Sequence, residues 1–521
     1  SNFLFVQSVA SRPLLSTATA LGFAPAALAQ TGEPDPKPKI KFDYDDVLRR
    51  AKDLAGAAYV SEPPPLPEQL NKIDFDSWRD IRFRPEKAFL NTPGSMFRLQ
   101  LFHLGHLYRW PVTVNIVKEG MPTPIPYAAN LFSYGRSHFS KPLPINLGFA
   151  GLRLHFPVNA PNVYDEVIAF LGASYFRFLG RGQRYGMSAR GLTVDAGTSS
   201  EEFPVFREFW VIAPPPDADQ ITIYALLDSA ATTGAYRFDL YPGEETALEV
   251  TATLFPRKQD VKFGLAPLTS MFFVGQNDHR VTEDFRRELH DSDGLLLSSS
   301  TGEWIWRPLR NPSTPQISSF IDKDMRGYGL LQRDRDFDHY QDLDLAYELR
   351  PSYFVEPRGD WGEGKVELIE LPTQDEAHDN IVASFVGKTP PSAGNAFGYR
   401  ITASLNFSDI SPNGRVVNTF LTEARALGSP EAAPRGSKRF IIDFSGGQLA
   451  YYALAPQTVE VVPTTTQGQI LRSFVVPNPH VKGFRAIIDL QLDSGSTDLR
   501  AFLRSGSRAL TETWIYPWQA E

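Results

Sequence analysis

The chain contains no cysteine. This absence excludes disulfide scaffolds, thiolate catalysis and cysteine-ligated metal sites. An excess of positive charge is also missing, because 52 Lys and Arg residues stand against 60 Asp and Glu residues, a formal net charge of −8. Proteins that follow a phosphate backbone need a basic face, so this balance argues against a nucleic-acid partner.

Long apolar runs are scarce as well. The longest candidate, residues 14–29, follows Arg12, is rich in small residues and ends in Ala27-Leu28-Ala29, which is typical of a secretory signal and its cleavage site. The run is too short and too polar for a good membrane span. We therefore predict a signal segment over residues 1–29 and a flexible lead-in over 30–42. The alternative for this segment is a disordered tail.

The composition that remains favours a large β protein with many loops. The 521 residues are too many for one ordinary domain, and 42% of them are apolar, enough for a substantial core. Aromatic residues make up 12%, and 42 Pro and 38 Gly residues supply turns. Aromatic rings can also pack on the faces of sugars, although most of them must belong to the core.

Local patterns predict a few elements directly. Asp43 can cap a helix over residues 43–58. Alternating apolar residues predict a strand over 248–254, with similar short strands at 221–227, 366–371 and 440–444. Apolar residues at helical spacing predict a second helix over 164–179, ended by Gly180.

A stretch rich in Pro, Gly and Ser at 387–395 is the best candidate for a domain boundary. We predict a large β-sandwich domain over 43–388 and a small β-sandwich over 396–521. Short strands at regular spacing support the second of these.

Two acidic clusters are candidates for chemistry. In the first, Asp291 and Asp293 precede Gly294, and Trp304, Trp306 and Arg307 follow shortly after. Such a loop could hold a sugar, with Asp291 as a general base. The alternative is an Asx-turn, in which the carboxylates only cap backbone N–H groups.

The second cluster contains Glu376 and Asp379, three residues apart. Two carboxylates held close together cannot both ionise cheaply, so the pKa of one rises and that group can donate a proton. The alternative is a solvated loop.

A third acidic stretch, 334–344, begins with the spacing of a calcium loop. However, His339 stands where the turn glycine belongs, and Leu345 stands where the bidentate Glu belongs. Arg333 and Arg335 interleave with the acids, so we predict an ion-pair network. The other histidines are scattered, and no G-x-S-x-G motif is present. We expect no metal and no cofactor.

Several colinear motifs resemble the OpgG/OpgD (MdoG/MdoD) family of osmoregulated periplasmic glucan biosynthesis. They are DIRFRP (80–85), FLGASYFR (170–177), GQRYGMSARG (182–191), EFP (202–204), HDSDGL (290–295), GLLQRDRDF (329–337), VEPR (355–358) and DNIVA (379–383).

The resemblance implies a galactose-mutarotase-like β-sandwich followed by an immunoglobulin-like one, in the periplasm. It implies β-1,2-glucan as substrate and an inverting glucanase as the activity. Carried onto this chain, the general acid falls on Asp379, the base on Asp291 and a supporting carboxylate on Glu376. A transglycosylase and a non-catalytic glucan-binding scaffold of the synthesis machinery at the inner membrane remain alternatives.

We further expect a long cleft that holds the glucan. The candidate substrate contacts comprise a carboxylate, aromatic stacking platforms and arginine donors, and the alternative for each aromatic is core packing. They are Asp293, Trp304, Trp306, Arg307, Tyr353, Arg358 and Trp361. An inverting pair needs its carboxyl groups roughly 6.5–9.5 Å apart to admit water.

Overall fold

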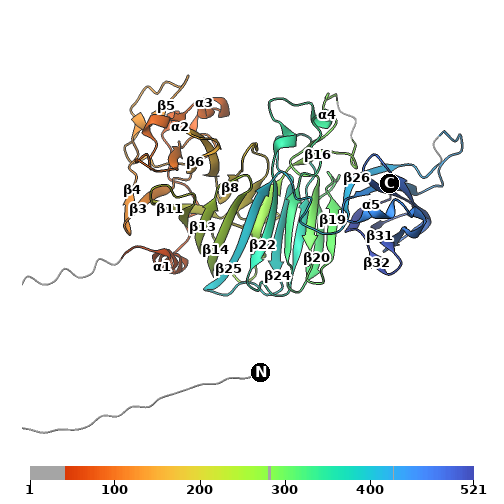
Figure 1. Cartoon of the computed structure of the whole chain (residues 1–521). Helices are drawn as coiled ribbons and strands as arrows, with labels where there is room; N and C mark the ends of the chain where they lie inside the picture. Colours follow the sequence, from red (N-terminus) through yellow and green to blue (C-terminus); the bar gives the residue numbers. More distant parts are fainter. Residues whose placement is uncertain (1–40, 280–282, 426–427, 521) are drawn as a thin grey trace, which may run out of the picture. The chain divides into compact units, whose positions relative to one another are not determined.

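The computed structural model describes residues 41–279, 283–425 and 428–520 (Figure 1). From Lys41 onward the chain forms one compact unit. Strands dominate it, which confirms the predicted all-β class. The predicted signal segment lies outside the described residues, as does most of the lead-in.

One sheet of fifteen strands runs through the whole unit. In spatial order its strands are β28 (Glu460–Thr465), β31 (Ser496–Ser505), β33 (Thr513–Gln519), β19 (Trp304–Pro308), β18 (Gly294–Ser298), β21 (Gly327–Leu331), β22 (Ser352–Arg358), β25 (Asn395–Ser404), β14 (Thr246–Pro256), β13 (Thr232–Tyr241), β12 (Ile221–Asp228), β11 (Val205–Ile212), β3 (Thr113–Lys118) and β4 (Met121–Pro124), with β32 (Arg508–Ala509) paired to β31.

A second sheet has ten strands. They are β2 (Arg98–Phe102), β6 (Gly151–Ala160), β7 (Val163–Leu171), β8 (Tyr175–Phe178), β9 (Ser188–Arg190), β15 (Phe263–Ser270), β24 (Ile381–Gly387), β23 (Gly364–Glu370) and β20 (Gln316–Asp322), with β10 (Leu192–Val194) paired to β15. A four-stranded sheet contains β26 (Arg415–Thr422), β27 (Ser437–Ser445), β30 (Gly483–Gln491) and β29 (Gln469–Asn478).

The remaining elements are short. Two strand pairs join β1 (Arg82–Phe83) to β5 (Phe132–Ser133) and β16 (Phe272–Val274) to β17 (Leu289–His290). The helices are α1 (Tyr44–Ala55), α2 (Glu68–Asn71), α3 (Phe75–Arg79), α4 (Phe337–Tyr340) and α5 (Leu449–Tyr452), with 3₁₀ turns η1 (Pro85–Lys87), η2 (Ala129–Leu131), η3 (Tyr347–Leu349) and η4 (Pro456–Thr458).

The two large sheets pack face to face around one core. Leu248 of β14 and Phe238 of β13 meet Phe170 and Phe178 of the ten-stranded sheet in this core. The alternation predicted for 248–254 is present as far as Ala252, because the even-numbered residues are buried and Thr251 is exposed, but Thr253 is buried as well. Asp43 caps α1 as predicted, and α1 packs on the outer face of β12 to β14.

The helix predicted over 164–179 is wrong, since this segment forms β7 and β8. The turn between them uses Gly172 and Ala173, both with positive φ (78° and 44°). Phe170 pairs with Phe176 across the hairpin, and both rings enter the sandwich core. The aromatic and β-branched residues of this segment suit a strand, and pairing with β6 and β9 outweighs the helical spacing.

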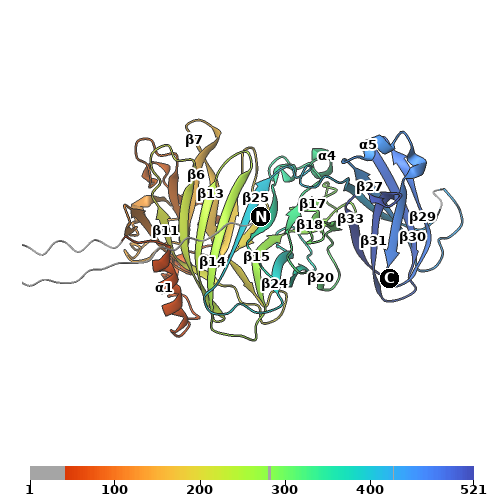
Figure 2. The ribbon, with the colours of Figure 1, turned by 60° about the horizontal axis from the view of Figure 1, so that its bottom comes forward.

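The four-stranded sheet begins later in the chain than the predicted boundary. Residues 388–394 connect β24 of the ten-stranded sheet to β25, which pairs with β14 and β22 in the middle of the long sheet. The first strand of the separate four-stranded sheet is β26. A second core then fills the space between that sheet and β31 and β33 (Figure 2). Turn-forming composition marks a loop, but it does not tell a connection within a sandwich from a connection between two domains. The division into two domains stays a prediction.

Candidate active site

The two predicted catalytic carboxylates lie on loops that attach to the same short segment, where β15 passes into β16. Asp291 lies between β17 and β18, and its N–H donates to the carbonyl of Met271 (2.8 Å). Asp379 lies between β23 and β24. Its neighbour Asn380 accepts from the N–H of Phe272 (2.8 Å) and donates to the carbonyl of the same residue (3.0 Å). The fold thus brings these two distant parts of the sequence together.

Asp379 faces a cavity of about 500 Å³. Tyr108, Tyr175, Arg177 and Tyr185 are among its lining residues. Asp379 is an exposed residue, but protein atoms crowd one side of its carboxyl group, and this partial desolvation raises the pKa of the group. The negative charge of Asp291 raises the pKa of Asp379 further, against the opposing effect of nearby arginines.

Asp291 is 5% exposed and forms an ion pair with Arg350. The Arg350 guanidinium lies over the ring of Tyr347 (3.8 Å), whose hydroxyl donates to Glu376 (3.1 Å). Glu376 also pairs with Arg286 (2.9 Å). This chain of contacts runs from the carboxylate of Asp291 to the loop that carries Asp379, so Glu376 supports the site from the side.

The arrangement therefore offers two carboxylates in different surroundings. Asp379, with its raised pKa, is suited to hold a proton and give it to a ligand in the cavity. Asp291, ion-paired with the guanidinium of Arg350, is the carboxylate placed to accept one.

Three of the predicted sugar contacts lie in the interior, and for these the prediction is wrong. Tyr353 is fully buried and stacks on Phe178, with its hydroxyl bonded to the backbone of that residue. Trp306 belongs to the second core. Arg307 is 1% exposed and pairs with the buried Glu370 (2.6 Å). Sequence alone could not tell the two faces of β19 and β22 apart, because both faces of the long sheet are covered at these positions.

Asp293 has a structural role, and its predicted sugar contact stays a prediction. Its Oδ2 accepts from the N–H groups of Arg333 (2.9 Å) and Asp334 (2.8 Å), which is how a turn-capping carboxylate behaves. Burial raises the pKa of this group. Asp293 thus fixes the start of the 334–344 segment and does not line the cavity of Asp379.

The remaining predicted contacts lie apart from the two acids. Trp304 packs against the second core. Trp361 packs against Phe385, and its indole N–H donates to a backbone carbonyl of β25 (3.0 Å). Arg358, at the end of β22, is exposed and pairs with Glu249 (3.2 Å). None of these three lines the cavity that holds Asp379.

The sequence reasoning missed several residues that do surround the acids. Tyr175, Arg177 and Tyr185 line the cavity, and Arg350 and Tyr347 hold Asp291 and Glu376. The first three belong to motifs that were recognised, FLGASYFR and GQRYGMSARG. The family motifs therefore pointed to these three residues, although their spacing in the sequence did not show that they line a cavity.

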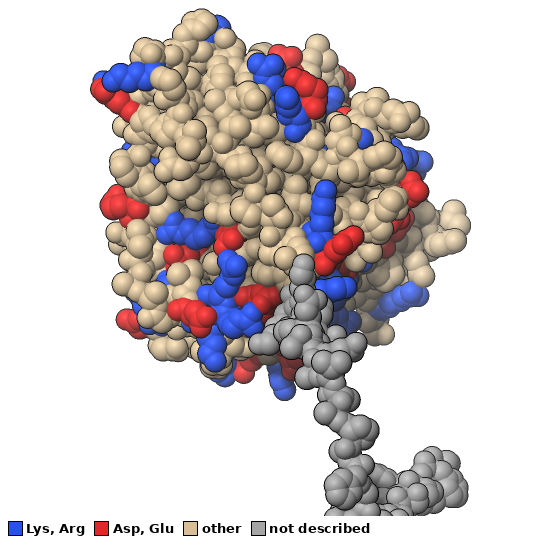
Figure 3. Space-filling view, turned by 90° about the vertical axis from the view of Figure 1, so that its left-hand side faces the viewer, with Lys and Arg blue, Asp and Glu red and all other residues tan. Residues whose placement is uncertain are grey.

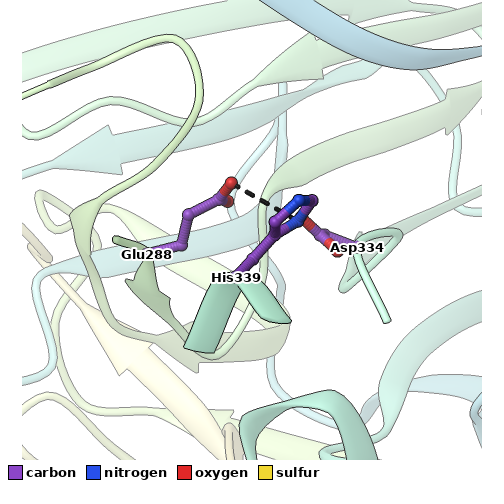
Figure 4. Close-up of side chains that lie close together, drawn as sticks. All are labelled: Glu288, Asp334 and His339. Carbon is purple, nitrogen blue, oxygen red and sulfur yellow. Dashed lines mark hydrogen bonds and ion pairs between the residues drawn. The ribbon is translucent and has the colours of Figure 1, made fainter. Parts of the chain in front are cut away.

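The acidic stretch 334–344 forms ion pairs, but not with the arginines expected. His339 Nδ1 lies 2.5 Å from Asp334 Oδ2 and 3.8 Å from Glu288 Oε1 (Figure 4). Two atoms bound to one tetrahedral zinc ion lie roughly 3.3 Å apart, so the shorter contact is a hydrogen bond. Arg333 pairs with Glu512, and Arg335 donates to backbone carbonyls. The cluster is an ion-pair network in this arrangement.

The face shown in Figure 3 intersperses basic with acidic side chains, and neither sign forms a continuous field on it. Within the described residues, no helix is both long enough and apolar enough to cross a membrane.

Comparison with known proteins places the chain in a family. A family model described as "Periplasmic glucan biosynthesis protein, MdoG" matches residues 42–518. Glucans biosynthesis protein G of Ralstonia nicotianae is 43% identical over 483 residues, covering 92% of this chain and 96% of the relative. Its namesake from Rhodopseudomonas palustris is 42% identical over 504 residues, 95% and 98% of the two chains.

A third relative carries the other name of the family. The probable glucans biosynthesis protein D of Shewanella oneidensis is 41% identical over 520 residues, covering 98% of this chain and 95% of the relative. Each of these matches extends through the loops that carry Asp291 and Asp379. The chain belongs to the MdoG family of periplasmic glucan biosynthesis proteins.

Proposed function

We propose that this protein is a periplasmic glycoside hydrolase that cleaves the β-1,2-glucan backbone with inversion. One observation carries the proposal: the loops of Asp291 and Asp379 attach to the adjacent residues Met271 and Phe272, and the pKa of Asp379 is raised while Asp291 is ion-paired. This is the division of roles that an acid and a base require. The family name supports the glucan as the partner and the periplasm as the location.

In this mechanism Asp379 protonates the glycosidic oxygen, directly or through a sugar hydroxyl. Asp291 takes a proton from the water that attacks the opposite face of the sugar. The cavity beside Asp379 holds a glucose unit, with Tyr175 as a ring on which the sugar can stack and Arg177 as a donor to its hydroxyls. Arg350 holds Asp291 through its ion pair, and Glu376 ties the loop of Asp379 to Tyr347 and Arg286.

Incubation with linear β-1,2-glucan tests the proposal. We expect shorter glucans whose new reducing ends are first formed as the α anomer, because inversion converts each β-linkage. Proton NMR during the first minutes measures the anomer of the new reducing ends, and mass spectrometry measures the length of the products. Products longer than the substrate would instead identify a transglycosylase. Binding without any new product would identify a glucan-binding scaffold.

The raised pKa of Asp379 predicts how activity depends on pH. The acid must be protonated, so kcat/KM should fall as pH rises through its pKa. Arg177 lowers that pKa, so Arg177→Gln should move the alkaline limb of the profile to higher pH. Arg358→Gln, which removes an exposed arginine away from the cavity, is the control and should leave the limb in place. An unmoved limb in Arg177→Gln would remove Asp379 as the titrating acid.

A further inference from the structure

His290, the residue before Asp291, is fully buried and has a hydrogen-bond partner on each ring nitrogen. Nδ1 lies 2.7 Å from Gln332 Oε1, and Nε2 lies 2.8 Å from Glu288 Oε2. The ring stacks on Phe272 of the neighbouring strand β16. His290 is therefore held from three sides at the position from which the chain turns toward Asp291.

The orientation of Gln332 decides which atoms donate. Its amide nitrogen donates to the carbonyls of His290 (2.7 Å) and Tyr347 (3.5 Å), so its oxygen must face the imidazole. An amide oxygen only accepts, and Nδ1 must therefore carry a proton. At Nε2 the partner is a carboxylate, which leaves two possibilities: an imidazolium beside a glutamate, or a neutral imidazole beside a protonated Glu288.

The surroundings favour the imidazolium. Burial alone would lower the pKa of His290, but the hydrogen bond to Glu288 and the charges of Glu288, Asp293 and Asp334 outweigh it and raise the pKa to about 9. Glu288 contacts both histidines. One of its carboxylate oxygens faces His290, and the other faces His339, which is the contact drawn in Figure 4. The ring of Tyr340 also packs against His290.

We propose that the His290 imidazolium is a positioning residue, which clamps the turn that carries Asp291 by donating to Glu288 and Gln332 at once. The proposal rests on the function proposed above. Gln332 closes the clamp by binding the backbone of both His290 and Tyr347. The same clamp thereby fixes Asp291 relative to η3, whose following residue Arg350 pairs with Asp291. Neither imidazole nitrogen is free to reach substrate, so His290 acts only through its neighbour.

The protonation state can be measured without any activity. Long-range ¹H–¹⁵N spectra of the full chain labelled at histidine would be recorded at about pH 8, where a histidine with an ordinary pKa is neutral. The signals of His290 are identified by their loss in His290→Gln. We expect one histidine with both nitrogens protonated, converted to a neutral ring in Glu288→Gln. A neutral His290 in the native chain would overturn the proposal, whether or not the protein cleaves glucan.

Kinetics test the positioning role. Glu288→Gln keeps an acceptor but removes the charge, and we expect kcat to fall by about 100-fold with KM little changed. This loss should shrink as pH is lowered, because the imidazolium forms again, whereas a general structural defect would not recover in this way. His480→Gln, an exposed substitution in the four-stranded sheet region, should behave like the native protein. Native kcat in Glu288→Gln at every pH would also refute the clamp. If the native protein cleaves no glucan, the proposed function fails. The spectra then still show whether His290 is an imidazolium.

Discussion

Asp379→Asn is expected to lower kcat for the cleavage of linear β-1,2-glucan by about 1,000-fold, since general acid catalysis contributes roughly 10²- to 10⁴-fold. The amide has nearly the same shape as the carboxyl group but cannot release a proton to the glycosidic oxygen. Substrate affinity should change little, because the amide keeps the shape of the carboxyl group and the other lining residues are unchanged. The reducing ends formed per minute give the rate, and calorimetry with the glucan gives the affinity.

The same loop provides a matched control. Asp375 is exposed, pairs only with His378 (2.8 Å) among the ion pairs of the described residues, and does not line the cavity. Asp375→Asn should therefore keep the native rate. Cleavage by Asp379→Asn at the native rate would show that another group is the acid. Equal losses in both variants would point to a disturbed loop instead.

Glu370→Ala is expected to destabilise the protein by about 3–5 kcal/mol, because it leaves the Arg307 guanidinium buried without its counter-charge. Glu370 is fully buried, and it accepts from Arg307 (2.6 Å) and from the N–H of Arg310 (2.8 Å). It joins β23 of the ten-stranded sheet to β19 of the long sheet, so the loss falls on the packing of one sheet against the other. The urea midpoint of unfolding measures the effect.

Two comparisons isolate the buried charge as the cause. Glu363→Ala removes a partner from the exposed pair with Lys388, and such pairs contribute only about 0–1 kcal/mol. Replacing both buried partners, as in Arg307→Met with Glu370→Leu, should recover most of the stability because no unpaired charge remains. A midpoint for Glu370→Ala equal to that of Glu363→Ala would contradict the prediction.

Local patterns predicted those parts of the fold that depend on neighbours in sequence. Asp43 caps a helix because its carboxylate reaches backbone N–H groups two or three residues ahead. The strand around 248–254 alternates because one of its faces is buried. The helix prediction for 164–179 was wrong because the apolar residues there fit a helical period, whereas the sheet provides strand partners on both sides. Likewise, Tyr353, Trp306 and Arg307 have the right chemistry for a sugar but lie where both faces of the long sheet are covered.

The sequence by itself determined the all-β class, the absence of thiol chemistry and, through the colinear motifs, the family and the two carboxylates proposed as acid and base. Only the tertiary structure decided what surrounds those carboxylates. Asp379 lies at a cavity, where partial desolvation and the charge of Asp291 raise its pKa, and Asp291 is paired with the guanidinium of Arg350. The reason is physical. Residue type and spacing set which groups can ionise, hydrogen-bond or stack. Desolvation and opposite charge act through space, between segments that a sheet brings together from far apart in the chain.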